Sequence, residues 1–186
     1  MLKFGLRRCH FDHSVFSHIS GRGKILLIVC VDDIIITGDD KQGIDDLKRY
    51  LQNSFQTKGL GKLRYFLGIE VAQSKVISLS QRKYVLDILE ETGLLGSKPM
   101  ETPMHPNVKL YEDQGELLSN PERYRRLVGK LNYLTITRLD ISFAVSVLSQ
   151  FMKDPRLPHW EAVIRIVRYL KAHPSRGLLY KTSSHL

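Results

Sequence analysis

The sequence has little of what marks a secreted, zinc-binding or membrane protein. Only two of its 186 residues are cysteines, Cys9 and Cys30, which indicates neither a disulfide framework nor a Cys-based zinc site. Its longest apolar run is broken by Asp32 and Asp33, and no run reaches the ~20 residues that a membrane helix needs. The seven histidines are scattered without ligand spacing. We therefore expect an ordinary globular chain with no membrane partner.

The charge of the chain is basic and uneven. The net charge is +9, and residues 119–186 carry 12 Lys and Arg against 4 Asp and Glu, whereas residues 1–118 carry 16 against 15. A basic C-terminal third is typical of proteins that bind a polyanion, and nucleic acid is the first candidate. A solvated basic surface on a helical domain would give the same count, and charge alone leaves both interpretations open.

Residues 25–38, I-L-L-I-V-C-V-D-D-I-I-I-T-G, form the central pattern of the sequence. An Ile- and Val-rich run on both sides of two acids predicts two buried strands joined by a tight turn, with Asp32 and Asp33 at its tip. Two carboxylates at such a tip favour hard divalent cations. A phosphorelay receiver domain also begins with a strand and paired acids, but a helix should then follow the acids. Ile34 to Ile36 predict a strand instead.

The rest of the first half alternates between helix and strand. Three- and four-residue spacing of Ile44, Leu47 and Leu51 predicts a helix over residues 41–55. Aromatic and branched residues predict a strand over 63–71, with a hairpin partner at 76–79. A helix capped by Ser80 and ending at Gly93 follows, and prolines then predict an extended connector over 98–119. This order favours an α+β fold with an antiparallel sheet.

Three helices are predicted in the C-terminal third. The first has Asn120 as its N-cap and Pro121 at its first position. The second begins near Asp140 and should bury Phe143, and the third begins near Pro158 and ends before Pro174. Trp160 lies at helical spacing in the third, so we interpret it as a core residue.

Several segments, in order, resemble the reverse transcriptase of copia-type LTR retrotransposons, the RNA-dependent DNA polymerase region of the Pol polyprotein. V-D-D-I-I-I-T-G (31–38) resembles its polymerase motif C, and L-G-K-L-R-Y-F-L-G-I-E-V (60–71) its primer-grip segment. Further similar segments cover nearly the whole chain; they are D-H-S-V-F (12–16), I-S-L-S-Q-R-K-Y (77–84), E-T-G (91–93), K-P-M-E-T-P-M (98–104), Y-R-R-L-V-G-K-L-N-Y-L-T (124–135), L-S-Q-F-M (148–152) and R-Y-L-K (168–171).

The resemblance implies a role for each group of residues. Asp32 and Asp33 would be two of three catalytic carboxylates and would bind Mg²⁺ or Mn²⁺. Phe66, Leu67 and Gly68 would lie in a primer-grip-like hairpin. The template–primer of RNA and DNA and the dNTPs would be the partners. Phosphate contacts, which are insensitive to sequence, would come from a basic set consisting of Arg123, Arg125, Arg126, Lys130, Arg165, Arg168 and Lys171.

The same resemblance predicts three domains. Residues 1–79 would be a partial polymerase palm with both hairpins, residues 80–118 a thumb helix and Pro-rich connector, and residues 119–186 an all-helical, basic thumb and connection. The family's first catalytic Asp lies further upstream than this chain reaches, since Asp12 matches the D-H-S segment. We therefore expect a fragment, truncated at both ends and inactive alone.

Two residues depart from the family pattern, and the N-terminus has two interpretations. Cys30 stands where the family usually has Tyr, and Leu139 replaces the Pro of its T-R-P-D-I segment. Residues 1–24 are basic with a single acid, Asp12, which loosely matches a mitochondrial transit peptide. We favour a palm strand there and expect an intracellular protein. A non-catalytic nucleic-acid-binding remnant and a polymerase part completed by another chain are the alternative functions.

Overall fold

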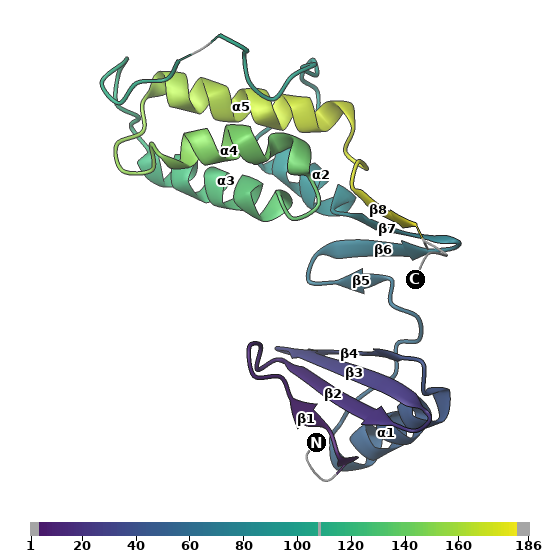
Figure 1. Ribbon diagram of the computed structural model, residues 1–186. Helices are drawn as coiled ribbons and strands as arrows, with labels where there is room; N and C mark the ends of the chain where they lie inside the picture. The colour runs from purple at the N-terminus through teal and green to yellow at the C-terminus, as the bar shows by residue number, and fades with distance from the viewer. Residues whose placement is uncertain (1–3, 108, 182–186) are drawn as a thin grey trace. The chain divides into compact units, whose positions relative to one another are not determined.

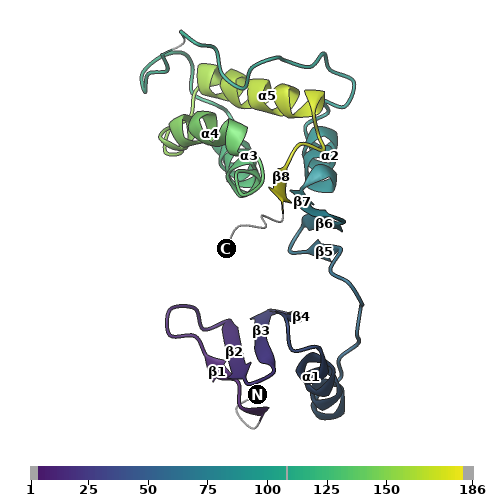
Figure 2. The same ribbon diagram turned by 45° about the vertical axis from the view of Figure 1, so that its right-hand side comes forward.

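The computed structural model describes residues 4–107 and 109–181. They fold into two compact units that divide between Leu63 and Arg64. The α+β class is confirmed, because each unit combines an antiparallel sheet with helices (Figures 1 and 2). In the described part of the chain, no helix is long and apolar enough to cross a membrane.

The N-terminal unit is an antiparallel sheet with one helix on it. Its strands pair in chain order, β1 (Arg7–Arg8), β2 (Val15–Ser20), β3 (Gly23–Cys30) and β4 (Asp33–Gly38). The helix is α1 (Lys41–Ser54), as predicted from its spacing. Side chains alternate between the faces of a strand, so Ile25 and Leu27 of β3 point to the same face, where they are buried with Leu47 and Leu51 of α1. The opposite face carries Leu26, which is 42% exposed.

The C-terminal unit has a second sheet and a helical layer. The sheet order is β5 (Tyr65–Phe66), β6 (Ile69–Gln73), β7 (Val76–Ser80) and β8 (Leu178–Lys181). The helical elements are α2 (Arg82–Glu91), α3 (Pro121–Leu134), η2 (Leu139–Ile141), α4 (Ser142–Ser149) and α5 (Leu157–Ala172). Their apolar stripes form one core, in which Leu131, Leu134, Leu148, Val163 and Leu170 are fully buried.

Residues 94–120 connect α2 to α3 and run along α5 (Figures 1 and 2). Among the described residues of this connector there is no helix or strand, apart from a single bridge between Leu117 and Arg156. Leu118 N–H also donates to the Pro155 carbonyl at 3.0 Å. The prediction of an extended connector is confirmed, and Pro99, Pro103 and Pro106 explain it because proline cannot continue a helix.

Four sequence predictions need correction. Residues 63–71 are not one strand, because Leu67 and Gly68 reverse the chain between β5 and β6. The N-cap of α2 is Gln81 rather than Ser80. Phe143 is 75% exposed, so α4 does not bury it. The C-terminal third is not entirely helical, because residues 178–181 form β8 and pair with β7.

The unit boundary also differs from the predicted limits of a palm at 1–79. Strands β5, β6 and β7 form one sheet with β8, in which β7 pairs with β8 of residues 178–181, so residues 64–79 belong with the helical part. The two hairpins expected within a single palm therefore lie in different units.

Candidate functional site

Asp32 and Asp33 lie at the tip of the β3–β4 hairpin, as predicted. Cys30 pairs with Asp33, which leaves Val31 and Asp32 as the two loop residues. Val31 has φ of +50° while Asp32 does not have positive φ, the pattern of a type II′ turn. Glycine is the usual residue there, and a β-branched side chain is strained. The sequence thus places a strained backbone directly beside the two acids, which are both exposed.

The two adjacent carboxylates are not forced to opposite faces of the sheet, as neighbouring residues within one strand would be. Asp33 is the first residue of β4, and strand alternation puts it on the face opposite to Ile34 and Ile36, which pack against the α1 core. Asp32 precedes the strand and belongs to the turn, so alternation does not force its side chain to the other face. Two adjacent, exposed carboxylates at a turn fit a hard divalent cation by the chemistry of their oxygens.

The base of the hairpin is fixed by a second pair of acids, Asp39 and Asp40. Asp40 is buried and accepts a hydrogen bond from Gly43 N–H at 2.8 Å, which caps α1. Asp39 accepts from the Lys24 backbone N–H, and this hydrogen bond holds the pKa of Asp39 below its usual range. The hairpin is therefore fastened to the helix at the end opposite to Asp32 and Asp33.

The donor set at the tip is incomplete by itself. Across residues 4–107 and 109–181, no three His, Cys, Asp or Glu side chains gather closely enough to hold a metal ion. Asp32 and Asp33 can supply part of a two-metal site, which needs a cluster of carboxylates holding cations ~3.5–4 Å apart.

The primer-grip-like residues occupy the turn between β5 and β6. Phe66 pairs with Ile69, and Leu67 and Gly68 are the two loop residues with φ of +47° and +75°. Positive φ at both loop positions is the pattern of a type I′ turn. The Tyr133 hydroxyl donates a hydrogen bond to the Leu67 carbonyl from α3. Leu67 is 44% exposed, so the turn presents an apolar side chain to solvent.

The basic residues of α3 are mostly paired within the unit. Arg126 and Lys130 both contact the Glu91 carboxylate at the end of α2, and the hydrogen bond from Lys130 holds the pKa of Glu91 below its usual value. Arg125 donates to the carbonyls of Met152 and Lys153 at 2.7 and 2.8 Å. These three residues therefore contact groups within the fold of the unit.

The basic residues of α5 hold the connector. Arg165 donates to the Thr102 carbonyl at 3.2 Å and to its hydroxyl at 2.8 Å, and Arg168 donates to the Lys98 carbonyl at 2.8 Å. Lys171 donates to the Ser97 carbonyl. Their three-residue spacing along the helix puts these side chains on one face of α5, where they all contact residues 97–102. Within the basic set, Arg123 is the residue whose side chain makes no hydrogen bond or ion pair in the described part of the chain; its guanidinium lies 4.8 Å from the Trp160 ring centroid.

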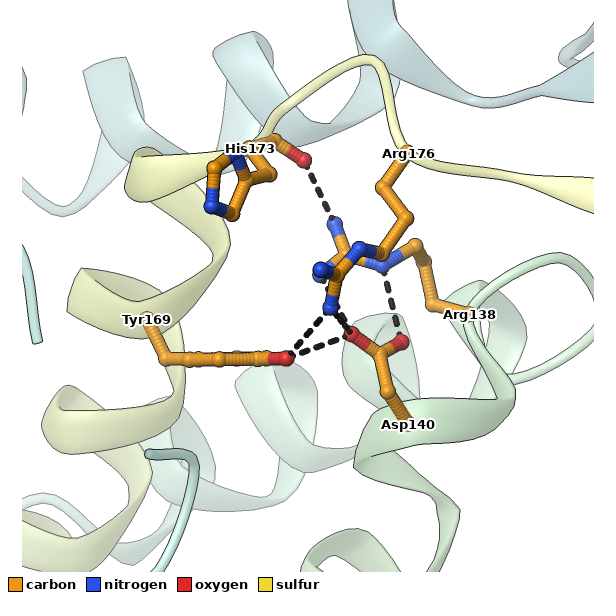
Figure 3. Close-up of polar contacts among 5 residues, drawn as sticks. All are labelled: Arg138, Asp140, Tyr169, His173 and Arg176. Carbon is orange, nitrogen blue, oxygen red and sulfur yellow. Dashed lines mark hydrogen bonds and ion pairs between the residues drawn. The ribbon is translucent and has the colours of Figure 1, made fainter. Parts of the chain in front are cut away.

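A polar network around the buried Arg138 side chain lies where α5 ends, and no sequence pattern predicted it (Figure 3). Arg138 is 1% exposed and donates to the His173 carbonyl at 3.0 Å as well as to Asp140. Asp140 also accepts from the Tyr169 hydroxyl at 2.7 Å and from Arg176 at 3.1 Å. Burial would raise the pKa of Asp140, but the bonds from Arg138 and Tyr169 outweigh it and hold that pKa well below its usual range.

Comparison with known proteins shows the family of the chain. The reverse transcriptase (RNA-dependent DNA polymerase) family matches residues 1–106. The chain belongs to this family. It is 41% identical over its whole length to the retrovirus-related Pol polyprotein from transposon RE1 of Arabidopsis thaliana, and 38% identical over 84% of its length to that from transposon TNT 1-94 of Nicotiana tabacum. These relatives are copia-type Pol polyproteins, so the predicted resemblance is confirmed.

The chain covers only a small part of the length of those polyproteins. It spans 13% of the RE1 polyprotein and 12% of the TNT 1-94 polyprotein. It spans 61% of a putative transposon Ty5-1 protein of Saccharomyces cerevisiae, with 32% identity over 99% of the chain. No solved structure matches it. Reverse transcriptases as a family act on nucleic acid and use divalent metal.

Proposed function

We propose that this chain contributes the catalytic hairpin, the primer-grip-like turn and the thumb of an RNA-directed DNA polymerase. The observation that carries the proposal is the hairpin tip, where Asp32 and Asp33 are adjacent and exposed beside the strained Val31. Strained backbone at positive φ clusters at functional sites, because the surrounding fold must hold it in place. A merely structural hairpin would have no reason to keep a β-branched residue at this position.

Asp32 and Asp33 would hold Mg²⁺, with Mn²⁺ as the alternative. When bound, such ions activate the primer 3′-hydroxyl and stabilise the leaving oxygen of the incoming dNTP. The residues of the chain position the carboxylates: Asp40 caps α1 at the base of the hairpin, and β3 and β4 pack on the α1 core beneath the tip. Template–primer and dNTPs are the proposed substrates.

We further propose that the chain needs another polymerase segment for activity. The carboxylate set at the tip is incomplete among the described residues. Strand β4 is at the edge of its sheet, and in the described part of the chain no further strand pairs with it. A complementing segment could extend the sheet at this edge, since an unpaired strand offers a row of free N–H and C=O groups.

Primer extension tests the proposal directly. The chain is assayed alone and as a replacement for the corresponding segment of the RE1 polyprotein, on poly(rA) primed with oligo(dT) in Mg²⁺. We expect extension only from the chimera, and at least a hundredfold loss with Asp32→Asn or Asp33→Asn. Asp45→Asn, an exposed carboxylate on α1, is the matched control and should leave extension unchanged. A folded chimera that extends equally well with Asp32→Asn would contradict the proposal.

A non-catalytic nucleic-acid-binding protein is the second candidate, and the charge of the C-terminal third favours it. Six of the seven basic residues predicted to contact phosphates already donate to protein groups. These contacts weaken the positive electrostatic potential of the surface but do not remove it. A gel shift of an RNA–DNA duplex, titrated with salt, tests this candidate. Binding whose affinity falls steeply with salt, in a chimera without extension activity, would support it.

A further inference from the structure

The turn that carries Leu67 and Gly68 has little support from its own hairpin. Strand β5 consists of two residues and lies at the edge of its sheet. Only Tyr65 and Phe66 pair with β6, and Leu67 occupies the left-handed region at φ of +47°. A bulky residue in that region costs roughly 1 kcal/mol. A two-residue ladder does not by itself hold a strained turn in one position, so another element has to contribute.

Tyr133 of α3 supplies that support. Its hydroxyl donates a hydrogen bond to the Leu67 carbonyl. Gly68 passes over the same side chain: a Cβ built on Gly68 would lie 3.7 Å from Tyr133 Oη and 3.8 Å from its Cε1. One tyrosine therefore donates a directional bond to the first loop residue and lies beside the second, where a Cβ would just fit against it.

The position of Tyr133 is itself fixed by the core. Its neighbours Leu131 and Leu134 are fully buried in the helical core. The Tyr84 ring of α2 lies edge to face against it, with ring centroids 5.5 Å apart and an angle of 84° between the ring planes. The Tyr133 hydroxyl thus projects from a rigid helix, which is the arrangement needed to hold another group within a fraction of an ångström.

We infer that Tyr133 is a positioning residue for primer extension, which acts by fixing the Phe66–Leu67–Gly68 turn against the primer end. The inference rests on the proposed function. Tyr133 does not touch the reacting atoms; its hydroxyl sets where the Leu67 carbonyl lies, and the turn then places the exposed Leu67 side chain and its neighbour Phe66. Small displacements of a primer terminus reduce the rate of the chemical step much more than they reduce the affinity for the duplex.

The test compares Tyr133→Phe with Tyr84→Phe in the RE1 chimera. Both remove one hydroxyl and keep the edge-to-face pair, but only Tyr133 donates to the turn. In single-turnover primer extension we expect Tyr133→Phe to slow the burst rate about five- to tenfold, the worth of one hydrogen bond. The affinity for template–primer should change less than twofold, because phosphate contacts dominate it. A purely structural role would instead reduce the burst amplitude and the Tm.

Amide hydrogen exchange of the chain itself gives a readout that does not depend on activity. Tyr133→Phe should lower the protection of the amides around Leu67 and Gly68, and Tyr84→Phe should leave them as in the wild type. Equal burst rates for the two variants in an active chimera, or unchanged exchange at the turn, would overturn the inference while leaving the proposed function intact. A wild-type chimera without extension would instead overturn the proposed function, and the inference with it.

Discussion

Gly177 passes Leu79 so closely that a Cβ built on Gly177 would lie 2.0 Å from the Leu79 carbonyl oxygen. The contact lies where the chain enters β8, and the neighbour is backbone, which cannot move aside cheaply. We expect Gly177→Ala to lower the free energy of unfolding of the C-terminal unit by about 1–3 kcal/mol, as overpacking does. Urea unfolding followed by the fluorescence of Trp160, the single tryptophan, measures it.

Gly129→Ala is the matched control for this substitution. Gly129 lies on the exposed side of α3, and a Cβ there meets nothing within 4 Å. Alanine should raise the stability of the same unit by about 0.5–1 kcal/mol, because glycine in a helix interior has more conformational freedom to lose. If Gly177→Ala also raised the free energy of unfolding, the close contact of Gly177 with Leu79 would not matter for stability.

Breaking the ion pair between Arg138 and Asp140 should lower the stability of the C-terminal unit strongly. Arg138 donates from Nε and Nη2 to the two carboxylate oxygens, each at 2.9 Å, and its side chain is fully buried (Figure 3). Arg138→Met should destabilise the C-terminal unit by about 3 kcal/mol, since it leaves a partly buried carboxylate with fewer donors. The double variant Arg138→Met with Asp140→Leu should recover part of that loss in the same urea experiment.

The low pKa of Asp140 also predicts acid sensitivity. Because its folded-state pKa lies below the unfolded value of about 3.9, its stabilising contribution is complete above that value and is lost as the pH falls further. The difference in unfolding free energy between wild type and Asp140→Asn should therefore be constant from pH 7 to 5 and shrink below about pH 4. A difference that grew on acidification would refute the assignment.

His159 predicts a second pH effect with a different window. Its Nδ1 accepts from Arg156 N–H at 3.0 Å, its Nε2 lies 3.1 Å from the Tyr111 carbonyl, and its ring stacks on Phe151. Burial lowers the pKa of His159, so the folded state keeps the ring neutral while the unfolded chain takes up a proton below about pH 6.5. Stability should fall from pH 7 towards pH 5, and His159→Gln should flatten this slope, whereas His105→Gln should not.

The hairpin tip predicts a substitution that stabilises the N-terminal unit. Val31→Gly removes the strain at φ of +50°, whereas Asp32→Gly is made at a loop residue without positive φ. Both changes add similar conformational freedom to the unfolded chain. The difference between the unfolding free energies of the two variants therefore measures the strain at Val31. We expect Val31→Gly to be the more stable variant by about 1–3 kcal/mol. Hydrogen exchange of the hairpin amides follows it.

Sequence periodicity was sufficient for the long elements and for the acidic tip. Helices α1, α3 and α5 repeat apolar residues every three or four positions, and the predicted cap Asn120 marks the start of α3. The adjacent acids in the middle of an apolar run left few places for a turn other than the one observed. These features depend on neighbours in the chain, and local patterns are enough to find them.

The missed features depend on residues that are distant in the sequence. The turn at Leu67 and Gly68 lies inside an apolar run that reads as one strand, and Gly68 was the only local signal. Helix α4 has eight residues and is apolar nearly all round, so its exposed position, Phe143, could not be told from its buried ones. The network around Arg138 and Asp140 was missed because its members show no spacing pattern in the sequence. They meet only where η2 packs against α5.

The pairing of β7 with β8 has a consequence for the order of folding. In the N-terminal unit every strand pairs with the strand next to it in the chain, so this unit can fold as soon as it leaves the ribosome. The second sheet joins Ile77 to Tyr180 and is complete only when synthesis reaches its last strand. Until then the β7 edge stays open, and a nascent chain that stalls within α5 would present it to neighbouring polypeptides as a template for aggregation.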